Sequence, residues 1–374
     1  MEQQAGFEPA VLGICSPLHW TSLPLLLVKY IMKRIYLDHW YSPIIGDNHE
    51  YETIYDYSQI PNDCDVIGLT FYDAYYDTHL PAIELCREKC EKLIVVESEP
   101  LSHHDGEFIN YSKFLADQNI KVFSDTIFNF SVDNLGTAIS WFTTNQNYYA
   151  PSSWPHWERW RNDMLFSISE ENWKRSAVFD CLLGTKRFHR DIIDDYYNKF
   201  FDKTRFIFSY FGKDITQGIW PRSMDLTGIP MTAAHIRYAG LRVPLSAILP
   251  FEIYNQSYYS IVAETTCNND YSHFTEKVAK PMLARRPFVV FSGQHYLRNL
   301  RSLGFQTFSD VINESYDSIS DDAQRFSAAW TEVETMCRRD PKQVYRVLQD
   351  VLDHNQRHFI ETDWYRDLRA EILQ

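Results

Sequence analysis

The sequence has little positive charge for its length, and this excludes one broad class of partner. Its 374 residues carry 36 lysines and arginines against 50 aspartates and glutamates, which gives a formal net charge of −14. A nucleic-acid backbone needs a basic surface, so we expect no nucleic-acid partner. A single nucleotide is not excluded, because it requires only a few local cations.

The chain also lacks the paired cysteines of a disulfide framework and the Cys or His pairs of a zinc site. Its seven cysteines are scattered, and only Cys86 and Cys90 lie close, on one face of a helix predicted over 79–92. We predict free thiols in a reducing, cytoplasmic compartment. His103 and His104 are adjacent on a predicted loop and point apart, so we predict no metal site.

No uninterrupted apolar run is long enough to cross a membrane. Residues 11–32 are apolar, but two prolines, a histidine and a tryptophan interrupt them, and they lack the basic start of a signal peptide. The strand-like pattern "MKRIYLDHW" begins at Met32. We therefore expect the native chain to start there and residues 1–31 to be a non-native or disordered leader.

Strand-like and helix-like patterns alternate along the rest of the chain, which predicts an α/β fold of parallel sheets with helical crossovers. Prolines and tryptophans interrupt the pattern at 151–176, where we place a linker. We predict an N-terminal, acceptor-side domain at 32–150, a second domain at 177–320, and C-terminal helices at 321–374 that pack across both. No signal predicts an oligomeric state.

Aromatic residues are abundant, with 24 tyrosines, 24 phenylalanines and 10 tryptophans. Such rings either pack in cores or stack on the rings of sugars and bases. We expect core packing to be the commoner use in this chain.

A basic turn follows a predicted strand at "LLGTKRFHRD", residues 182–191. Gly184 lets the backbone approach a ligand, and Lys186, Arg187 and Arg190 add positive charge where a helix begins, which favours a diphosphate. The glycine spacing of a Walker loop or a dinucleotide fingerprint is absent. A solvated basic turn without a ligand is the alternative interpretation.

Two acids flank a polar loop in "VAETTCNNDYSHFTEKVAKP", residues 262–281. Glu264 follows a predicted strand and Glu276 opens a predicted helix, so both can face one cleft. A carboxylate there can accept hydrogen bonds from sugar hydroxyls, and Lys277 can pair with phosphate. The alternative is structural, with Thr275 as the helix cap and Glu276 in a first turn where the dipole favours an acid. Both interpretations can hold together.

The third candidate segment, "VVESEP", is acidic and ends a predicted strand with Glu97 and Glu99. Ligands gather at the carboxyl ends of parallel strands. A carboxylate at such a position suits a general base that takes the proton of an acceptor hydroxyl. The choice between the two glutamates stays open.

Together, "SIVAETT", "HFTEKVAKPMLARRPFVVFSG" and "LRSLGF" resemble the donor-binding half of GT-B glycosyltransferases. The resemblance is closest to the α-1,3-fucosyltransferase type and its bacterial and phage relatives. In that family a glutamate before a loop, a Thr-Glu-Lys that opens a helix, and a strand with proline and glycine recur in this order. "LLGTKRFHR" is similar to the basic segment of the same domain, and the resemblance covers about residues 177–320.

The resemblance implies two facing Rossmann-like domains that bind a nucleotide-sugar donor, with GDP-fucose as the best match, and a glycan acceptor. It implies that Glu276 holds ribose or sugar hydroxyls and that Lys277 binds the diphosphate. The basic segment would neutralise the leaving diphosphate without a metal or another cofactor, and Glu97 would be the base of an inverting displacement.

Three alternatives to this interpretation remain. The chain could be a GT-B transferase for another sugar nucleotide, acting with retention, or a non-catalytic relative that binds nucleotides or glycans. An oxidoreductase with a Rossmann cofactor is third, because the glycine fingerprint is missing.

Overall fold

The computed structural model describes the chain in segments that leave out its first 33 residues. They are residues 34–38, 51–54, 56–71, 76–97, 120–124, 126–129, 135–137, 175–184, 186–210, 235–238, 241–244, 251–254 and 256–374. The predicted leader, Glu99, the two adjacent histidines and nearly all of the predicted linker lie outside these segments. Within them, no helix combines the length and the apolar character needed to cross a bilayer.

The N-terminal half of the chain contributes a six-stranded sheet in which every neighbouring pair is parallel. In order across the sheet, the strands are β2 (Glu52–Ile54), β1 (Ile35–Asp38), β3 (Cys64–Phe71), β4 (Cys90–Glu97), β5 (Ile120–Ser124) and β7 (Leu135–Thr137). The central strands are almost continuously apolar because both faces of a parallel sheet are buried. Helix α2 (Tyr76–Arg87) packs on one face and α12 (Arg366–Leu373) on the other.

The helix predicted over 79–92 is wrong at its C-terminal end. Helix α2 stops at Arg87, and Cys90 opens strand β4, so Cys86 and Cys90 do not share a helix face. Between the helix and the strand, the side chain of Lys89 donates hydrogen bonds to the carbonyl oxygens of residues 57, 58 and 60, at 2.7–3.2 Å. The cysteines that the structure describes are all free thiols, as predicted.

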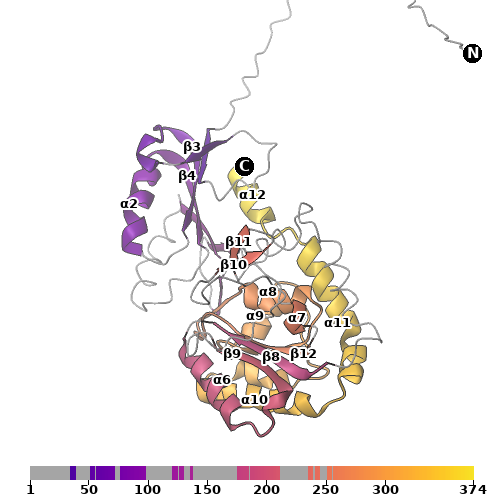
Figure 1. Ribbon diagram of the computed structural model, residues 1–374. Coiled ribbons are helices and arrows are strands. Elements are labelled where there is room, and N and C mark those ends of the chain that lie inside the picture. Colours follow the sequence, from indigo (N-terminus) through magenta and orange to yellow (C-terminus); the bar gives the residue numbers. More distant parts are fainter. Residues whose placement is uncertain are drawn as a thin grey trace, which may run out of the picture. The chain divides into compact units, whose positions relative to one another are not determined.

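The C-terminal half contributes a second parallel sheet, of four strands. In order, they are β14 (Phe288–Phe291), β12 (Ser257–Ala263), β8 (Ala177–Leu183) and β9 (Phe206–Tyr210). Figure 1 shows α6 (Phe188–Lys199) and α10 (Asp322–Arg338) on one face, and α8 (Glu276–Leu283) and α9 (Tyr296–Ser302) on the other. The chain is therefore α/β with Rossmann-like parallel sheets, as the alternating pattern predicts.

Aromatic rings fill much of the second core. Phe179 lies 5.3 Å from Tyr259 and 6.0 Å from Phe206, and Phe206 in turn stacks on Trp330 at 5.9 Å, all measured between ring centroids. These rings are buried, which confirms packing as a major use of the aromatic residues.

The C-terminal tail is helical, as its periodicity predicts. Helix α11 (Pro341–Glu361) begins at its proline, and Asp340 caps it by accepting a 3.0 Å hydrogen bond from the amide of Lys342. This helix packs on α8, while α12 joins the core of the N-terminal sheet. At the end of α9, Gly304 has φ +93°, the left-handed conformation in which glycine commonly ends a helix.

Two short antiparallel pairs and a few single turns complete the described elements. Strand β10 (His235–Tyr238) pairs with β11 (Leu241–Pro244), and β6 (Thr126–Phe128) pairs with β13 (Tyr271–His273). The remaining helical turns are η2 (Tyr57–Gln59), η4 (Lys203–Arg205), α7 (Phe251–Tyr254) and η6 (Glu314–Ser318).

Candidate functional site

The topology of the C-terminal sheet singles out one position for a ligand. Strand β8 comes first in the chain and lies between β9 and β12. The chain therefore adds β9 on one side of β8 and later adds β12 on the other side. In doubly wound sheets such a switch point opens a crevice at the carboxyl ends of the strands, where ligands bind. Here β8 ends at Leu183 and β12 at Ala263. The two segments selected from the sequence therefore begin at the same edge.

The basic turn after β8 leads directly into α6. Arg187 is the N-cap residue in an extended conformation and makes no side-chain capping bond. Lys186 is exposed, with its Nζ 3.8 Å from Asp191 Oδ2, and Asp191 is also held by a 2.7 Å hydrogen bond from the hydroxyl of Tyr210 at the end of β9. The turn is therefore anchored from the neighbouring strand while its two cationic side chains reach solvent.

Arg190 is unlike the other two cations because it is buried, with 3% of its surface exposed. Its Nη2 donates to the carbonyl oxygen of Glu264 at 3.0 Å and to that of Ala263 at 3.4 Å. A Cβ added to Gly184 would lie 3.4 Å from its Nη1, so the turn passes close over the guanidinium. Arg190 thus fastens α6 to the end of β12 with one nitrogen and points another toward the glycine.

His189 makes a second link between the two segments. Its Nε2 lies 2.8 Å from the carbonyl oxygen of Glu264, and its Nδ1 lies 3.2 Å from the sulfur of Cys267. Burial, helped by the nearby charges of Arg190, Arg187 and Lys277, lowers the pKa of His189 to about 4, although the hydrogen bond to the Glu264 carbonyl opposes the shift. The imidazole is therefore neutral at pH 7, so Nε2 donates to the carbonyl and Nδ1 accepts from the thiol.

Glu264 is fully buried, and protein groups occupy its carboxylate. It accepts hydrogen bonds from the hydroxyl of Thr275 at 2.5 Å, the hydroxyl of Tyr296 at 2.6 Å, and the amides of Thr265 and Thr275 at 3.3 and 3.4 Å. Burial raises its pKa, while Lys277 and these hydroxyls oppose the shift. In the structure Glu264 fixes the turn that precedes α8 and does not present its oxygens to solvent.

Thr275 caps α8, as the structural interpretation of the motif predicts. Its hydroxyl oxygen accepts a 3.2 Å hydrogen bond from the amide of Lys277. The Nζ of Lys277 lies 2.8 Å from Glu276 Oε1 and 3.0 Å from the hydroxyl of Thr265. The Glu276 and Lys277 side chains keep 13% and 24% of their surface exposed, so both can still meet a ligand.

The charges at the start of α8 are set by their neighbours. Burial raises the pKa of Glu276, but Lys277 and Lys280 outweigh it and bring the pKa down to about 2. Burial lowers the pKa of Lys280 to about 8. Two residues before Thr275, His273 is 2% exposed, and burial lowers its pKa to about 3. Its Nδ1 has no hydrogen-bond partner among the described residues. The site therefore holds a fixed carboxylate beside an ammonium group.

The two segments also act on each other electrostatically, which shows that they are close. Burial lowers the pKa of Arg190 and Arg187 lowers it further, while Glu264 and Glu276 oppose the shift. The structure thus brings the basic turn and the Thr-Glu-Lys motif together around the ends of β8 and β12. The predicted donor-binding residues in this neighbourhood are Gly184, Lys186, Arg187, Arg190, Glu264, Thr275, Glu276 and Lys277.

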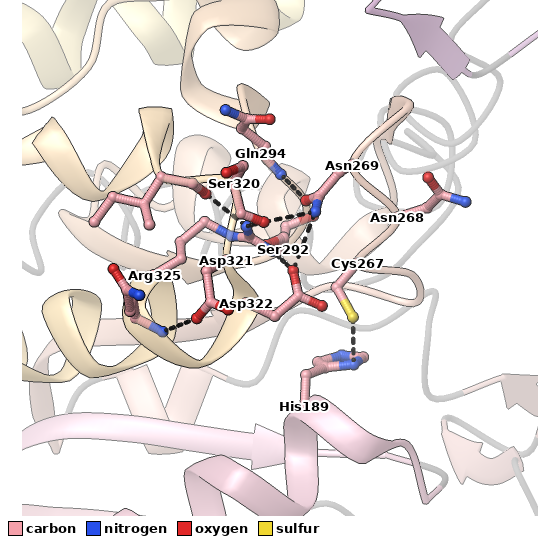
Figure 2. Close-up of polar contacts among 12 residues, drawn as sticks. His189, Cys267, Asn268, Asn269, Ser292, Gln294, Ser320, Asp321, Asp322 and Arg325 are labelled. Atoms are coloured by element: carbon pink, nitrogen blue, oxygen red, sulfur yellow. Dashed lines mark hydrogen bonds and ion pairs between the residues drawn. The ribbon is translucent and has the colours of Figure 1, made fainter.

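The loop after β12 is clamped from several sides, and Figure 2 shows these contacts. Asn269 donates to the carbonyl oxygen of Ser320 at 2.9 Å and to Asp322 Oδ1 at 3.3 Å, and accepts from the amide of Gln294 at 2.8 Å. A Cβ at Gly293 would overlap the backbone carbonyl of Asn268. The loop carries Thr265 and Cys267, so the clamp holds two of the groups that surround the site.

A strand from the N-terminal half also reaches this region. Strand β6 pairs with β13, with Thr126 opposite His273, immediately before the Thr-Glu-Lys motif. Beyond it, Asn129 donates to the carbonyl oxygens of Asn269 and Gln294 at 2.7 and 3.1 Å and accepts from Arg298 and Asn299 at 2.6 and 2.8 Å. The sequence pattern does not predict this connection.

The predicted base lies on the other sheet. Glu97 is the last residue of β4, with Phe71 and Ser124 as its neighbours on β3 and β5. The backbone therefore places it at the carboxyl edge, as predicted, although one strand away from the switch point of that sheet, which lies between β1 and β3. Glu99 lies outside the described residues.

Within the described segments, no group of three His, Cys, Asp or Glu side chains is arranged to hold a metal ion. No protein-family model matches the chain, and comparison with curated proteins and with solved structures gives no significant match.

Proposed function

We propose that this protein is a GT-B glycosyltransferase that moves a sugar from a nucleoside-diphosphate donor, with GDP-fucose as the first candidate, to a glycan hydroxyl. The observation that carries the proposal is the meeting of two complementary segments at one switch point. Lys186, Arg187 and Lys277 supply positive charge there, and Glu276 supplies an ionised carboxylate.

The donor's two chemical parts match these charges. A diphosphate carries negative charge and suits the cationic turn together with Lys277. Ribose and hexose rings offer vicinal hydroxyls, which a carboxylate such as Glu276 accepts as hydrogen-bond donors. Because the Lys277 ammonium already touches Glu276, a ligand that binds both would contact them side by side.

The reaction is a single displacement at the anomeric carbon. The acceptor hydroxyl oxygen attacks this carbon. The bond between the anomeric carbon and the β-phosphate oxygen breaks, and the nucleoside diphosphate leaves. Glu97 takes the hydroxyl proton, and Lys186, Arg187 and Lys277 stabilise the charge that develops on the leaving phosphate. Arg190 and Glu264 are positioning residues that hold α6, the end of β12 and the Thr275 turn in register.

The experiment is a calorimetric and thermal-shift screen of GDP, UDP, CDP and dTDP against the purified chain. We expect one or more of these to bind, and Lys277→Ala to weaken that binding about tenfold or more, since it removes a charge-assisted hydrogen bond. Lys199→Ala is the matched control, because this lysine is exposed at the opposite end of α6.

Transfer is then tested by release of the nucleoside diphosphate from the donor whose nucleotide binds. Binding without any turnover, across acceptors and donors, would favour the non-catalytic alternative. Selective binding of a nucleotide other than GDP would keep the fold and change the donor. A folded chain that binds none of the four would reject the proposal.

A further inference from the structure

One exposed aromatic side chain adjoins the candidate site. Among the described residues, the large apolar side chains that are exposed are Leu85, Phe188, Phe201, Val347 and Ile360. Isolated exposed apolar residues are common on protein surfaces, so exposure alone carries no argument. Phe188 differs from the others in its position, because it directly follows Arg187 and is the first residue of α6, at the carboxyl end of β8.

The ring of Phe188 contacts two other rings and is still half exposed. Its centroid lies 6.0 Å from that of His189, edge to face, and 6.0 Å from that of the fully buried Phe326. His189 is itself held through both ring nitrogens. About half of the Phe188 surface, 53%, is exposed. A ring fixed on one side offers a flat face without a large loss of side-chain entropy.

The direction of the side chain also favours a contact with a ligand at the turn. In an α-helix every Cα–Cβ bond tilts toward the helix N-terminus. Phe188 occupies the first helical position, so its Cα–Cβ bond tilts toward the turn that carries Lys186 and Arg187. A half-exposed aromatic ring therefore directly follows two cationic residues at the start of α6.

We propose that Phe188 stacks on the nucleobase of a nucleoside diphosphate whose phosphates are bound by the adjacent cations. This inference rests on the proposed function and adds to it the part of the donor that the charges do not recognise. A ligand with a planar ring next to phosphates complements an aromatic face next to Lys186 and Arg187. Stacking is tolerant of base identity, so the contact supplies affinity for purine and pyrimidine nucleotides alike.

The test separates recognition of the base from recognition of the phosphates. Dissociation constants of GDP, UDP and inorganic pyrophosphate are measured by calorimetry for the wild-type chain, Phe188→Ala, Phe188→Trp and Phe201→Ala. We expect Phe188→Ala to weaken GDP and UDP about tenfold to a hundredfold and to leave pyrophosphate within about twofold. Phe188→Trp keeps a stacking face and retains nucleotide affinity.

Phe201→Ala is the matched control, because it removes an 86% exposed ring just beyond the other end of the same helix and leaves all three ligands unaffected. Unchanged nucleotide affinity in Phe188→Ala would overturn the inference. Equal weakening of pyrophosphate would also overturn it, since the ring would then act by shaping the cationic turn. If the wild-type chain binds pyrophosphate as tightly as it binds GDP and UDP, the stacking is rejected and the proposed function stands. If the wild-type chain binds none of the three ligands, the proposed function is rejected as well.

Discussion

The two parallel sheets share one winding, and the C-terminal sheet carries the candidate site at its switch point. In the N-terminal sheet, β1 comes first and lies between β2 and β3; in the C-terminal sheet, β8 comes first and lies between β9 and β12. The topology therefore predicts a crevice at the same place in each. In the second sheet, the loops at that place carry the cations and the carboxylate of the candidate site.

The cores differ as well. The buried clusters of the N-terminal sheet are mostly aliphatic, with residues such as Ile67, Leu93 and Val95, whereas aromatic rings link the strands and α10 in the C-terminal core. The same winding can therefore be built from either kind of side chain. What sets a binding site apart is the chemistry of the loops that the winding brings together, and this chemistry follows from the local sequence.

The sharpest way to break this comparison is to neutralise one glutamate at each carboxyl edge. If Glu97 is the base, Glu97→Gln lowers kcat by about 10²–10⁴-fold and leaves nucleotide affinity unchanged. We expect Glu264→Gln instead to weaken nucleotide binding and to lower the free energy of unfolding by about 1–3 kcal/mol, because four donors lose a charged acceptor.

Donor turnover, calorimetry and urea unfolding together distinguish the two outcomes. Glu361→Gln, at an exposed position at the end of α11, is the control and changes none of the three measurements. If both variants lose turnover and keep their nucleotide affinity and stability, the division of roles between the two sheets is wrong.

Local patterns predict most of the elements because their signals lie within a few residues. The strand at Ala177–Leu183 and the helix that follows it are examples, and so is the cap at Thr275. Long-range contacts leave no such signal. Nothing in the sequence indicates that Tyr296 donates to Glu264, or that the three residues of β6 pair with β13.

The sequence also does not predict which of the charged side chains are buried. A solvated basic turn and a diphosphate site look alike in "GTKRFHR", and both lead one to expect three exposed cations. The structure exposes Lys186, half-exposes Arg187 and buries Arg190 against backbone carbonyls. Whether an arginine in such a turn is buried or exposed depends on whether its guanidinium can reach a backbone carbonyl on a neighbouring strand. Only the fold determines that distance.

Acid should act on the C-terminal site through its buried histidines. The pKa of His273 is about 3 in the folded protein, against an ordinary value of 6.5. As the pH falls below about 6.5, the unfolded chain takes up the proton first, so stability declines between that pH and about 3 and is constant above it. From pH 7 to pH 5, this contributes a loss on the order of 2 kcal/mol.

His273→Phe removes this contribution, and it leaves no polar atom unpaired where Nδ1 now lacks a partner. Lys277 and Glu276 act on the same residue, and Glu276 stays charged throughout this range because its pKa is about 2. Urea unfolding at pH 7 and pH 5 measures the difference between the variant and the wild type. If acid lowers the free energy of unfolding equally in both proteins, His273 takes up its proton as readily in the folded state as in the unfolded chain, and the prediction is wrong.

A last comparison separates two glycines at the edge of the C-terminal sheet. A Cβ at Gly293 would overlap the backbone carbonyl of Asn268, whereas a Cβ at Gly184 would lie 3.4 Å from Arg190 Nη1, an ordinary contact. We expect Gly293→Ala to lower the free energy of unfolding by about 1–3 kcal/mol, because the loop that carries Thr265 must shift.

Gly184→Ala serves as the counterpart, with stability unchanged or raised by about 0.4–1 kcal/mol through the unfolded state. Because Gly184 is proposed to let the backbone approach the ligand, this variant weakens nucleotide binding all the same. Thermal unfolding of both variants measures the loss of stability expected for Gly293→Ala. Calorimetry measures the loss of nucleotide affinity expected for Gly184→Ala. Normal nucleotide affinity in Gly184→Ala would remove the turn from the binding site and leave Lys277 and Glu276 to carry it.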